Sequence, residues 1–132
     1  MFKEIKDKIY EKLSEIESIG TVQDYVELWT SSYPAVMFEP SWWEQEAFSL
    51  SSKKRTYNFK IYILQEFTTI GKKQAWDIVL QVYDDILNKF VEDFTLAGLC
   101  VNLEAYQWEF DTLDSEDGKT VFGTIYLKVI TN

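Results

Sequence analysis

The chain has 132 residues, of which 46% are hydrophobic and 17% aromatic, and its 22 acidic and 13 basic residues give a net charge of −9. This length and apolar content fit a single domain with its own core, which we assign to residues 1–132. The acidic balance argues against a protein that tracks nucleic acid, because such binding needs a cationic surface.

Missing residue types exclude several kinds of chemistry. The chain contains no histidine, so nucleophile–histidine catalysis is excluded. Its one cysteine, Cys100, has no internal disulfide partner and lies in a strand-like run, where we expect a small buried side chain. No apolar run approaches the roughly 20 residues that span a bilayer, and no signal peptide is visible. We therefore expect a protein made and kept in a cytoplasm, without a membrane partner.

The first 18 residues have the pattern of an amphipathic helix. Apolar residues recur every three or four positions and predict one buried stripe: Phe2, Ile5, Ile9, Leu13 and Ile16. Gly20 marks a helix stop. Between Thr21 and Ser32 neither the helical nor the strand period fits, so we expect an extended segment that leads into a turn.

Residues 35–65 contain two predicted strands joined by an exposed arm, residues 41–55. The first strand, Ala35–Glu39, is closed by Pro40, because proline cannot donate a hydrogen bond to a neighbouring strand. The second, Arg55–Gln65, alternates apolar and polar residues with the period of a half-buried strand.

Three large aromatic residues lie among the polar residues of the arm: Trp42, Trp43 and Phe48. Rings of this size are unfavourable in water, so either they fold back on the core or a partner covers them. We favour the partner, because two adjacent tryptophans in a strand face opposite sides.

The second half of the chain predicts a long helix and a hairpin. Residues 72–94 carry a helical stripe that we assign to the core: Trp76, Val79, Leu80, Tyr83, Ile86, Leu87, Phe90, Val91 and Phe94. Residues 99–131 then form a hairpin of two strands, Leu99–Phe110 and Thr120–Thr131. The order of elements predicts an α+β fold, with two helices packed on one face of a largely antiparallel four-stranded sheet and an extended arm or hairpin.

The loop of this hairpin, residues 111–119, is rich in carboxylates: Asp111, Asp114, Glu116 and Asp117. Their spacing does not match a calcium-binding loop, and we assign no metal site. The loop is either a solvated tip or a charged projection into an assembly or channel, where it sets the local field.

Carboxylates elsewhere leave one enzymatic reading open. A hydrolytic pair could be drawn from Glu39, Glu44, Glu46 and Glu66, since glycosidases need two carboxylates at the right separation. The sequence shows no enclosing pocket for such a pair, and we assign no catalytic residue and no cofactor.

The layout resembles the small tail terminator (tail completion) or minor tail proteins of long-tailed bacteriophages over nearly the whole chain. The resemblance rests on Tyr33-Pro34-Ala35-Val36, the arm with Trp42-Trp43, Arg55-Thr56-Tyr57-Asn58-Phe59-Lys60-Ile61, the helix from Lys72 and the acidic hairpin. It implies a virion protein, assembled in the host cytoplasm, that forms a ring, usually a hexamer. Such a ring caps the tail tube protein, joins it to the head connector and lets DNA pass without specific binding.

Two groups of residues are expected to serve this assembly. We assign the subunit interface to Tyr33, Trp42, Trp43, Phe48 and Arg55. The acidic hairpin loop would face the lumen or a partner. The alternatives are another head-to-tail joining (neck) protein, an oligomeric interaction module unrelated to phage, and a carboxylate-dependent hydrolase.

Overall fold

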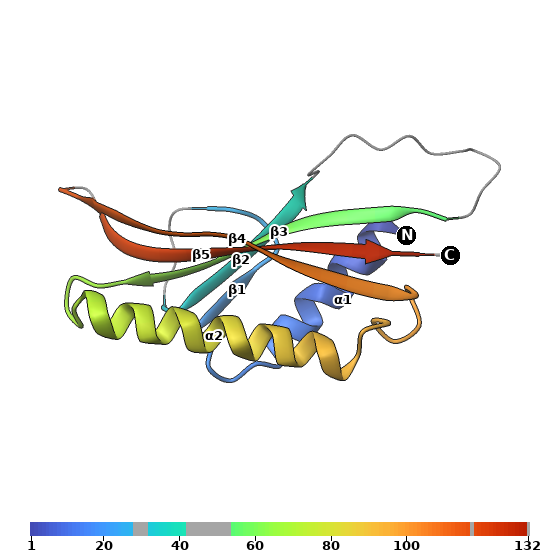
Figure 1. The fold of residues 1–132 in the computed structure, drawn as a ribbon, viewed down its shortest axis with the longest axis horizontal. Coiled ribbons are helices and arrows are strands. Elements are labelled where there is room, and N and C mark those ends of the chain that lie inside the picture. The colour runs from blue at the N-terminus through green and yellow to red at the C-terminus, as the bar shows by residue number, and fades with distance from the viewer. Residues whose placement is uncertain (28–31, 42–53, 117, 132) are drawn as a thin grey trace.

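In the part of the chain that the structure describes, a mixed five-stranded sheet carries two helices on one of its faces (Figure 1). The computed structural model describes residues 1–27, 32–41, 54–116 and 118–131, with the side chains at 108 and 115 excepted. The elements in chain order are α1 (Phe2–Ser14), β1 (Thr21–Gln23), β2 (Ala35–Ser41), β3 (Thr56–Glu66), α2 (Lys72–Glu92), β4 (Asn102–Ser115) and β5 (Gly118–Ile130). The strands lie side by side in the order β1-β2-β3-β5-β4.

The α+β class is confirmed, but the prediction of a four-stranded, largely antiparallel sheet is wrong, because β1 joins as a fifth strand parallel to β2. Gly20 sits where this pairing begins. Its N–H donates to the Pro34 carbonyl at 2.8 Å, and a Cβ at position 20 would lie 2.8 Å from the Tyr33 carbonyl oxygen. A strand of three residues is too short to show a period of two, so the sequence indicated only an extended segment there.

Helix α1 buries a stripe of three residues, Ile5, Ile9 and Leu13, each completely. The helix ends at Ser14 rather than at residue 18. Beyond it the backbone tightens into turns, in which the N–H of Ile16 and then of Ile19 donates to the carbonyl three residues back. The apolar spacing continues through this turn, which is why the pattern overestimates the helix.

Helix α2 follows its predicted range closely and buries three residues of the predicted stripe, Val79, Ile86 and Phe90, together with two that were not predicted, Ala75 and Val82. Three members of the predicted stripe are exposed instead: Leu80 at 47%, Val91 at 73% and Phe94 at 53%. The predicted stripe is wider than the arc of a helix that one sheet face can cover, so its margins stay in solvent.

Alternation along the central strands separates a core face from an open face. The side chains that face the helices are buried: Val36, Phe38, Phe59, Ile61, Ile63, Val121, Ile125, Leu127 and Val129. On this face Ile61 of β3 lies between Phe38 of β2 and Ile125 of β5. Every second residue therefore points to the open face, away from α1 and α2.

Three strands are longer than predicted. β2 continues through Pro40 to Ser41, although Pro40 was expected to close it. β1 ends opposite Met37, so the outer edge of β2 at Pro40 has no described strand beside it, and proline is tolerated at such an edge. β4 and β5 pair as far as Ser115 and Gly118, through most of the predicted acidic loop. The hairpin thus ends in a tight turn.

Ion pairs join the C-terminal ends of the two helices. The Lys12 Nζ lies 3.2 Å from Asp93 Oδ2, and the Lys89 Nζ lies 2.7 Å from Glu15 Oε2. Burial opposes the charge of Asp93, but hydrogen bonds from Lys12, the Ala97 N–H and Thr95 outweigh it and lower the pKa of the Asp93 carboxyl. The pairs fix the end of α2 from which the chain turns into β4.

A glycine in β5 lets an aromatic ring from β4 pack against the sheet. A Cβ on Gly123 would lie 2.7 Å from Cε1 of Phe110 and 3.4 Å from Cγ1 of Val79. The Phe110 ring is flanked by Trp76 and Tyr83 of α2, with ring centroids 6.1 and 5.5 Å away. Strand β4 is thereby attached to α2 as well as to β5.

The substitution Gly123→Ala is expected to destabilise the fold by about 1–3 kcal/mol, because the added methyl group displaces a ring that α2 holds in place. Urea unfolding measures this loss. In the control Gly118→Ala the new Cβ meets only Cδ2 of Leu113, at 3.7 Å, an ordinary contact. That control should change stability by no more than about 0.5 kcal/mol. Equal stability of the two variants would show that the Phe110 ring is free to move.

Candidate functional site

The open face of the sheet carries aromatic, apolar and charged side chains together. Tyr62 of β3 and Tyr126 of β5 are half-buried there, and the Lys60 Nζ lies 5.0 Å and 5.7 Å from their ring centroids. The Tyr62 hydroxyl donates to Glu39 Oε1 at 3.3 Å. Burial raises the pKa of Tyr62, and Lys60 acts against that rise. This half of the open face is therefore occupied by contacts within the chain.

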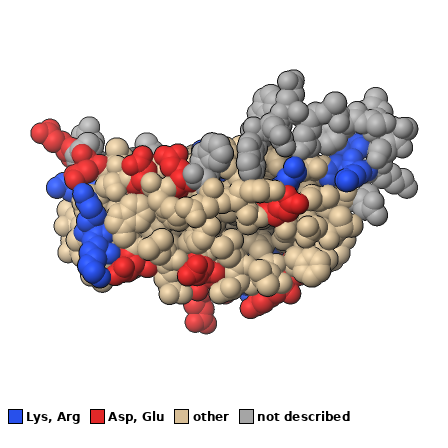
Figure 2. Space-filling view, in the orientation of Figure 1, with Lys and Arg blue, Asp and Glu red and all other residues tan. Residues whose placement is uncertain are grey.

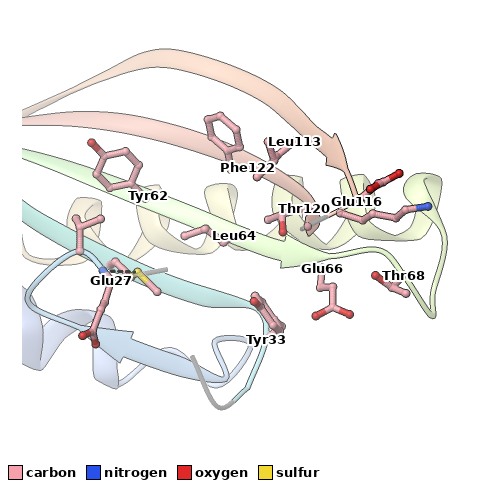
Figure 3. Close-up of a pocket in the computed structure, with 14 residues that line it drawn as sticks. Glu27, Tyr33, Tyr62, Leu64, Glu66, Thr68, Leu113, Glu116, Thr120 and Phe122 are labelled. Atoms are coloured by element: carbon pink, nitrogen blue, oxygen red, sulfur yellow. Dashed lines mark hydrogen bonds between the residues drawn. The ribbon is translucent and has the colours of Figure 1, made fainter. Parts of the chain in front are cut away.

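The other half contains a pocket of about 800 Å³, at the end of the sheet near the β4–β5 turn (Figure 3). Its apolar lining comes from four strands and from the segment after β1: Val26, Met37, Leu64, Leu113 and Phe122. In Figure 3, Leu64 lies near the middle of the strands and Leu113 and Phe122 lie along one side. The volume is within the range of sites that bind small molecules or peptide side chains.

The charged groups of this pocket are mostly carboxylates. Among its described lining residues, Glu27, Glu66 and Glu116 stand against a single basic residue, Lys119. In the described part of the chain, no ion pair involves any of these three glutamates. Burial raises the pKa of the neighbouring Tyr33, and the charge of Glu66 adds to the rise. The pocket is thus apolar in its middle and negatively charged around it.

Strand β4 forms one edge of the sheet and is its longest strand, with 14 residues. Its inner side pairs with β5, whereas no described strand pairs with its outer side. A register shift between Gln107 and Glu109 interrupts the pairing with β5. Large apolar side chains are exposed just before the strand and along it: Val101 at 49%, Tyr106 at 37% and Leu113 at 51%. An edge of this kind is a template for another strand.

Two of the carboxylates predicted to form one acidic loop lie on opposite faces of β4. Asp111 is paired with Phe122 in register, which places it on the open face. Asp114 lies on the α2 side, where its Oδ2 is 3.6 Å from the Lys72 Nζ. The period of a strand separates them, because the predicted loop is largely strand.

The other two acidic residues lie at or beside the turn. Glu116 is exposed and lines the pocket. Asp117 lies outside the described residues. Figure 2 shows carboxylates along both margins of the molecule in this view, not gathered at the tip of the hairpin alone. The negative charge is therefore distributed, with a local excess at the pocket.

The structure describes two of the five residues predicted for the subunit interface, and these two lie far apart. Tyr33 precedes β2 and lines the pocket, whereas Arg55 precedes β3 at the other end of the sheet. Along the direction of β3, the distance from Arg55 to Leu64 is about 30 Å, at about 3.3 Å per residue. The other three members of the predicted interface lie outside the described residues: Trp42, Trp43 and Phe48.

The two described members of the candidate hydrolytic set, Glu39 and Glu66, lie too far apart to act as a pair. Glu39 lies opposite Lys60 in the pairing of β2 with β3. Lys60 and Glu66 are six positions apart on β3, so Glu39 and Glu66 are separated by about 20 Å along the strand. Glycosidase pairs are separated by about 5–9.5 Å. The other two candidates, Glu44 and Glu46, lie outside the described residues. Among the residues that the structure describes, no group of three side chains is placed to hold a metal ion.

The lone thiol is buried, and burial raises the pKa of Cys100. Its Sγ lies 3.5 Å from the Phe94 carbonyl oxygen, toward which it donates. A raised pKa disfavours the thiolate, which is the nucleophilic form. The position suits a small packing side chain, as the sequence predicts.

The pocket is the feature that sequence reasoning missed. One sequence feature could have indicated the pocket. Leu64 and Phe122 are apolar residues on the open face of strands whose other face already supplies the core. The remaining lining residues come from segments far apart in the chain, such as Val26 and Leu113, which only the tertiary structure brings together.

A scan against models of known protein families finds no match, and a search of curated proteins also finds none. Within the described ranges, none of the helices has the length and apolar character needed to cross a membrane.

Proposed function

We propose that this chain is a structural virion protein, similar to the tail terminators of long-tailed phages, that assembles into a ring of six copies. The ring would cap the tail tube protein and join it to the head connector. The observation that carries this proposal is the outer edge of β4, a strand of 14 residues with exposed apolar side chains along it. A subunit built for assembly needs such a surface, and the order of elements supports the phage assignment.

The two edges of the sheet are unlike, which favours a ring over a dimer. One edge is the long strand β4; the other consists of the three residues of β1 and, beyond Met37, the outer side of β2. Pairing β4 of one copy with the β1–β2 edge of the next joins two different surfaces. Contacts of this heterologous kind give a ring when the rotation from one copy to the next closes, whereas pairing β4 with itself would give a twofold dimer.

The charge of the chain suits a ring through which DNA passes. A net charge of −9 repels the phosphate backbone, so DNA would slide through without specific binding. The alternatives, another neck protein or an oligomeric module unrelated to phage, would use the same β4 edge. Dependence of assembly on the tail tube separates the terminator from the unrelated module.

The first experiment is the mass in solution by light scattering, for the chain alone and with tail tube protein. We expect a hexamer, or a monomer that becomes a hexamer on the end of the tube. The variant Ala105→Lys should prevent assembly, because it places a charge on the exposed middle of β4 without changing a buried residue.

The matched control is Gln74→Lys, which adds the same charge at an exposed position of α2. It should assemble as the unchanged chain does. A monomer or dimer that ignores the tube would overturn the terminator assignment. A ring that forms equally well with Ala105→Lys would instead remove β4 from the interface.

The aromatic arm is proposed to complete the subunit interface. Replacing both Trp42 and Trp43 with alanine should weaken assembly about tenfold or more, because buried aromatic side chains dominate interface energies. Sedimentation of the double variant against the unchanged chain, at several concentrations, measures the effect. The control is Trp76→Phe on α2, which keeps an aromatic ring against Phe110 of β4. Unaltered assembly of the double variant would exclude the arm from the interface.

The acidic hairpin is proposed to face the bore or a partner. Neutralising Asp111, Asp114, Glu116 and Asp117 together should impair assembly on the tube or slow DNA ejection from complete particles, because local repulsion of DNA is lost. Neutralising four carboxylates on or beside the helices, Glu4, Glu17, Asp84 and Glu92, gives a control of equal net charge. Normal assembly and normal DNA passage in the hairpin variant would contradict the proposal.

A further inference from the structure

We propose that the pocket on the open face binds an extended segment of a partner protein in which a lysine or arginine side chain is flanked by apolar side chains. The inference rests on the geometry of the pocket and its charges. It stands whether or not the chain forms a ring.

The middle of the pocket offers an apolar surface that contacts within the chain do not use up. Leu64 and Phe122 are only half-buried, and Leu113 is 51% exposed, although all three line the same cavity. Leaving such groups in water is unfavourable, and covering them with apolar side chains of a partner contributes roughly 25 cal/mol for each Å² removed from water. The occupant therefore has apolar side chains.

The charges around this surface select a cation. Glu27, Glu66 and Glu116 line the pocket, and Lys119 is the one basic residue in its described lining. No ion pair within the described ranges neutralises the three glutamates. A lysine or arginine can lay its aliphatic stem along Leu64 and Phe122 while its charged end reaches a carboxylate. Figure 3 shows the Glu66 and Glu116 side chains toward the same end of the pocket, near Thr68 and the turn.

The shape of the pocket favours a chain segment over a small molecule. The lining runs across the sheet from the segment after β1 to the end of β4, and the cavity is partly open to solvent. A peptide can lie across such an opening with its side chains pointing down, whereas a small ligand would leave much of its own surface in water. Complementary charge then fixes which side chain enters the acidic end.

The test uses three fluorescein-labelled pentapeptides and the full chain, with binding followed by fluorescence anisotropy. The first peptide, Leu-Lys-Val-Arg-Leu, is expected to bind saturably and to weaken as salt is raised. The second, Leu-Glu-Val-Glu-Leu, keeps the apolar side chains and reverses the charge, and it should not bind. The third, Ser-Lys-Ser-Arg-Ser, keeps the charge without the apolar side chains and should bind at least about tenfold more weakly.

Variants of the chain locate the binding. Glu66→Gln should weaken the first peptide about three- to fivefold, the effect of losing one partly exposed ion pair. The control Glu17→Gln removes the same charge beyond the end of α1, at an exposed position outside the pocket, and should change nothing. Leu113→Ser should also weaken binding, and because the Leu113 side chain is exposed this variant is expected to keep its fold.

Three results would overturn the proposal. One is no saturable binding of the first peptide at millimolar concentration. Another is equal loss of affinity for Glu66→Gln and Glu17→Gln, which would mean attraction to the net charge of the chain. The third is competition by hexylamine at the same concentration as the peptide, which would make the pocket a site for a small cationic amphiphile.

Discussion

The register of β3 between β2 and β5 is the constraint on which the rest of this molecule depends. It places Phe38, Ile61 and Ile125 in one row under the helices. Because side chains alternate along a strand, the same register sends Tyr62 and Leu64 to the open face. A slip of one residue would exchange the two sets, burying Lys60 under α1 and α2 and exposing the core. The apolar stripes of both helices therefore specify the pocket on the far side of the sheet, although neither helix touches it.

The elements with a strong period are the ones that the sequence predicts well. The stripe of α1 and the alternation of β3 each recur over several turns or pairs, so chance patterns are unlikely to imitate them. The sequence did not predict β1, because a strand of three residues has no recognisable period. Its parallel pairing depends on the close approach of Gly20 to Tyr33. The prediction of an acidic loop was wrong for a different reason. Its carboxylates indicate a solvated loop, but the segment is a strand that is held by pairing with β5 and by the packing of Phe110 against α2.

The candidate site was less predictable than the fold because its parts have no common local pattern. The edge of β4 can be inferred from a hairpin at the end of the chain, but which of its two sides remains open follows from the strand order. The pocket needs residues from the segment after β1, from four strands and from the turn, and no spacing in the sequence relates Val26 to Leu113. Charge was visible in the composition, whereas its distribution over two faces of β4 required the register.

Leu113 belongs to both surfaces, since it lies on the edge strand and also lines the pocket. If a partner strand pairs along the outer side of β4 as far as Leu113, it lies against one wall of the pocket. The hairpin that carries Leu113 is itself attached to α2, through the pair between Asp114 and Lys72 and through Phe110. Movement of the hairpin is therefore opposed by the helix layer. A partner at the β4 edge and a partner in the pocket would therefore both contact the β4–β5 hairpin. Packing against α2 already holds this hairpin in position before either partner binds.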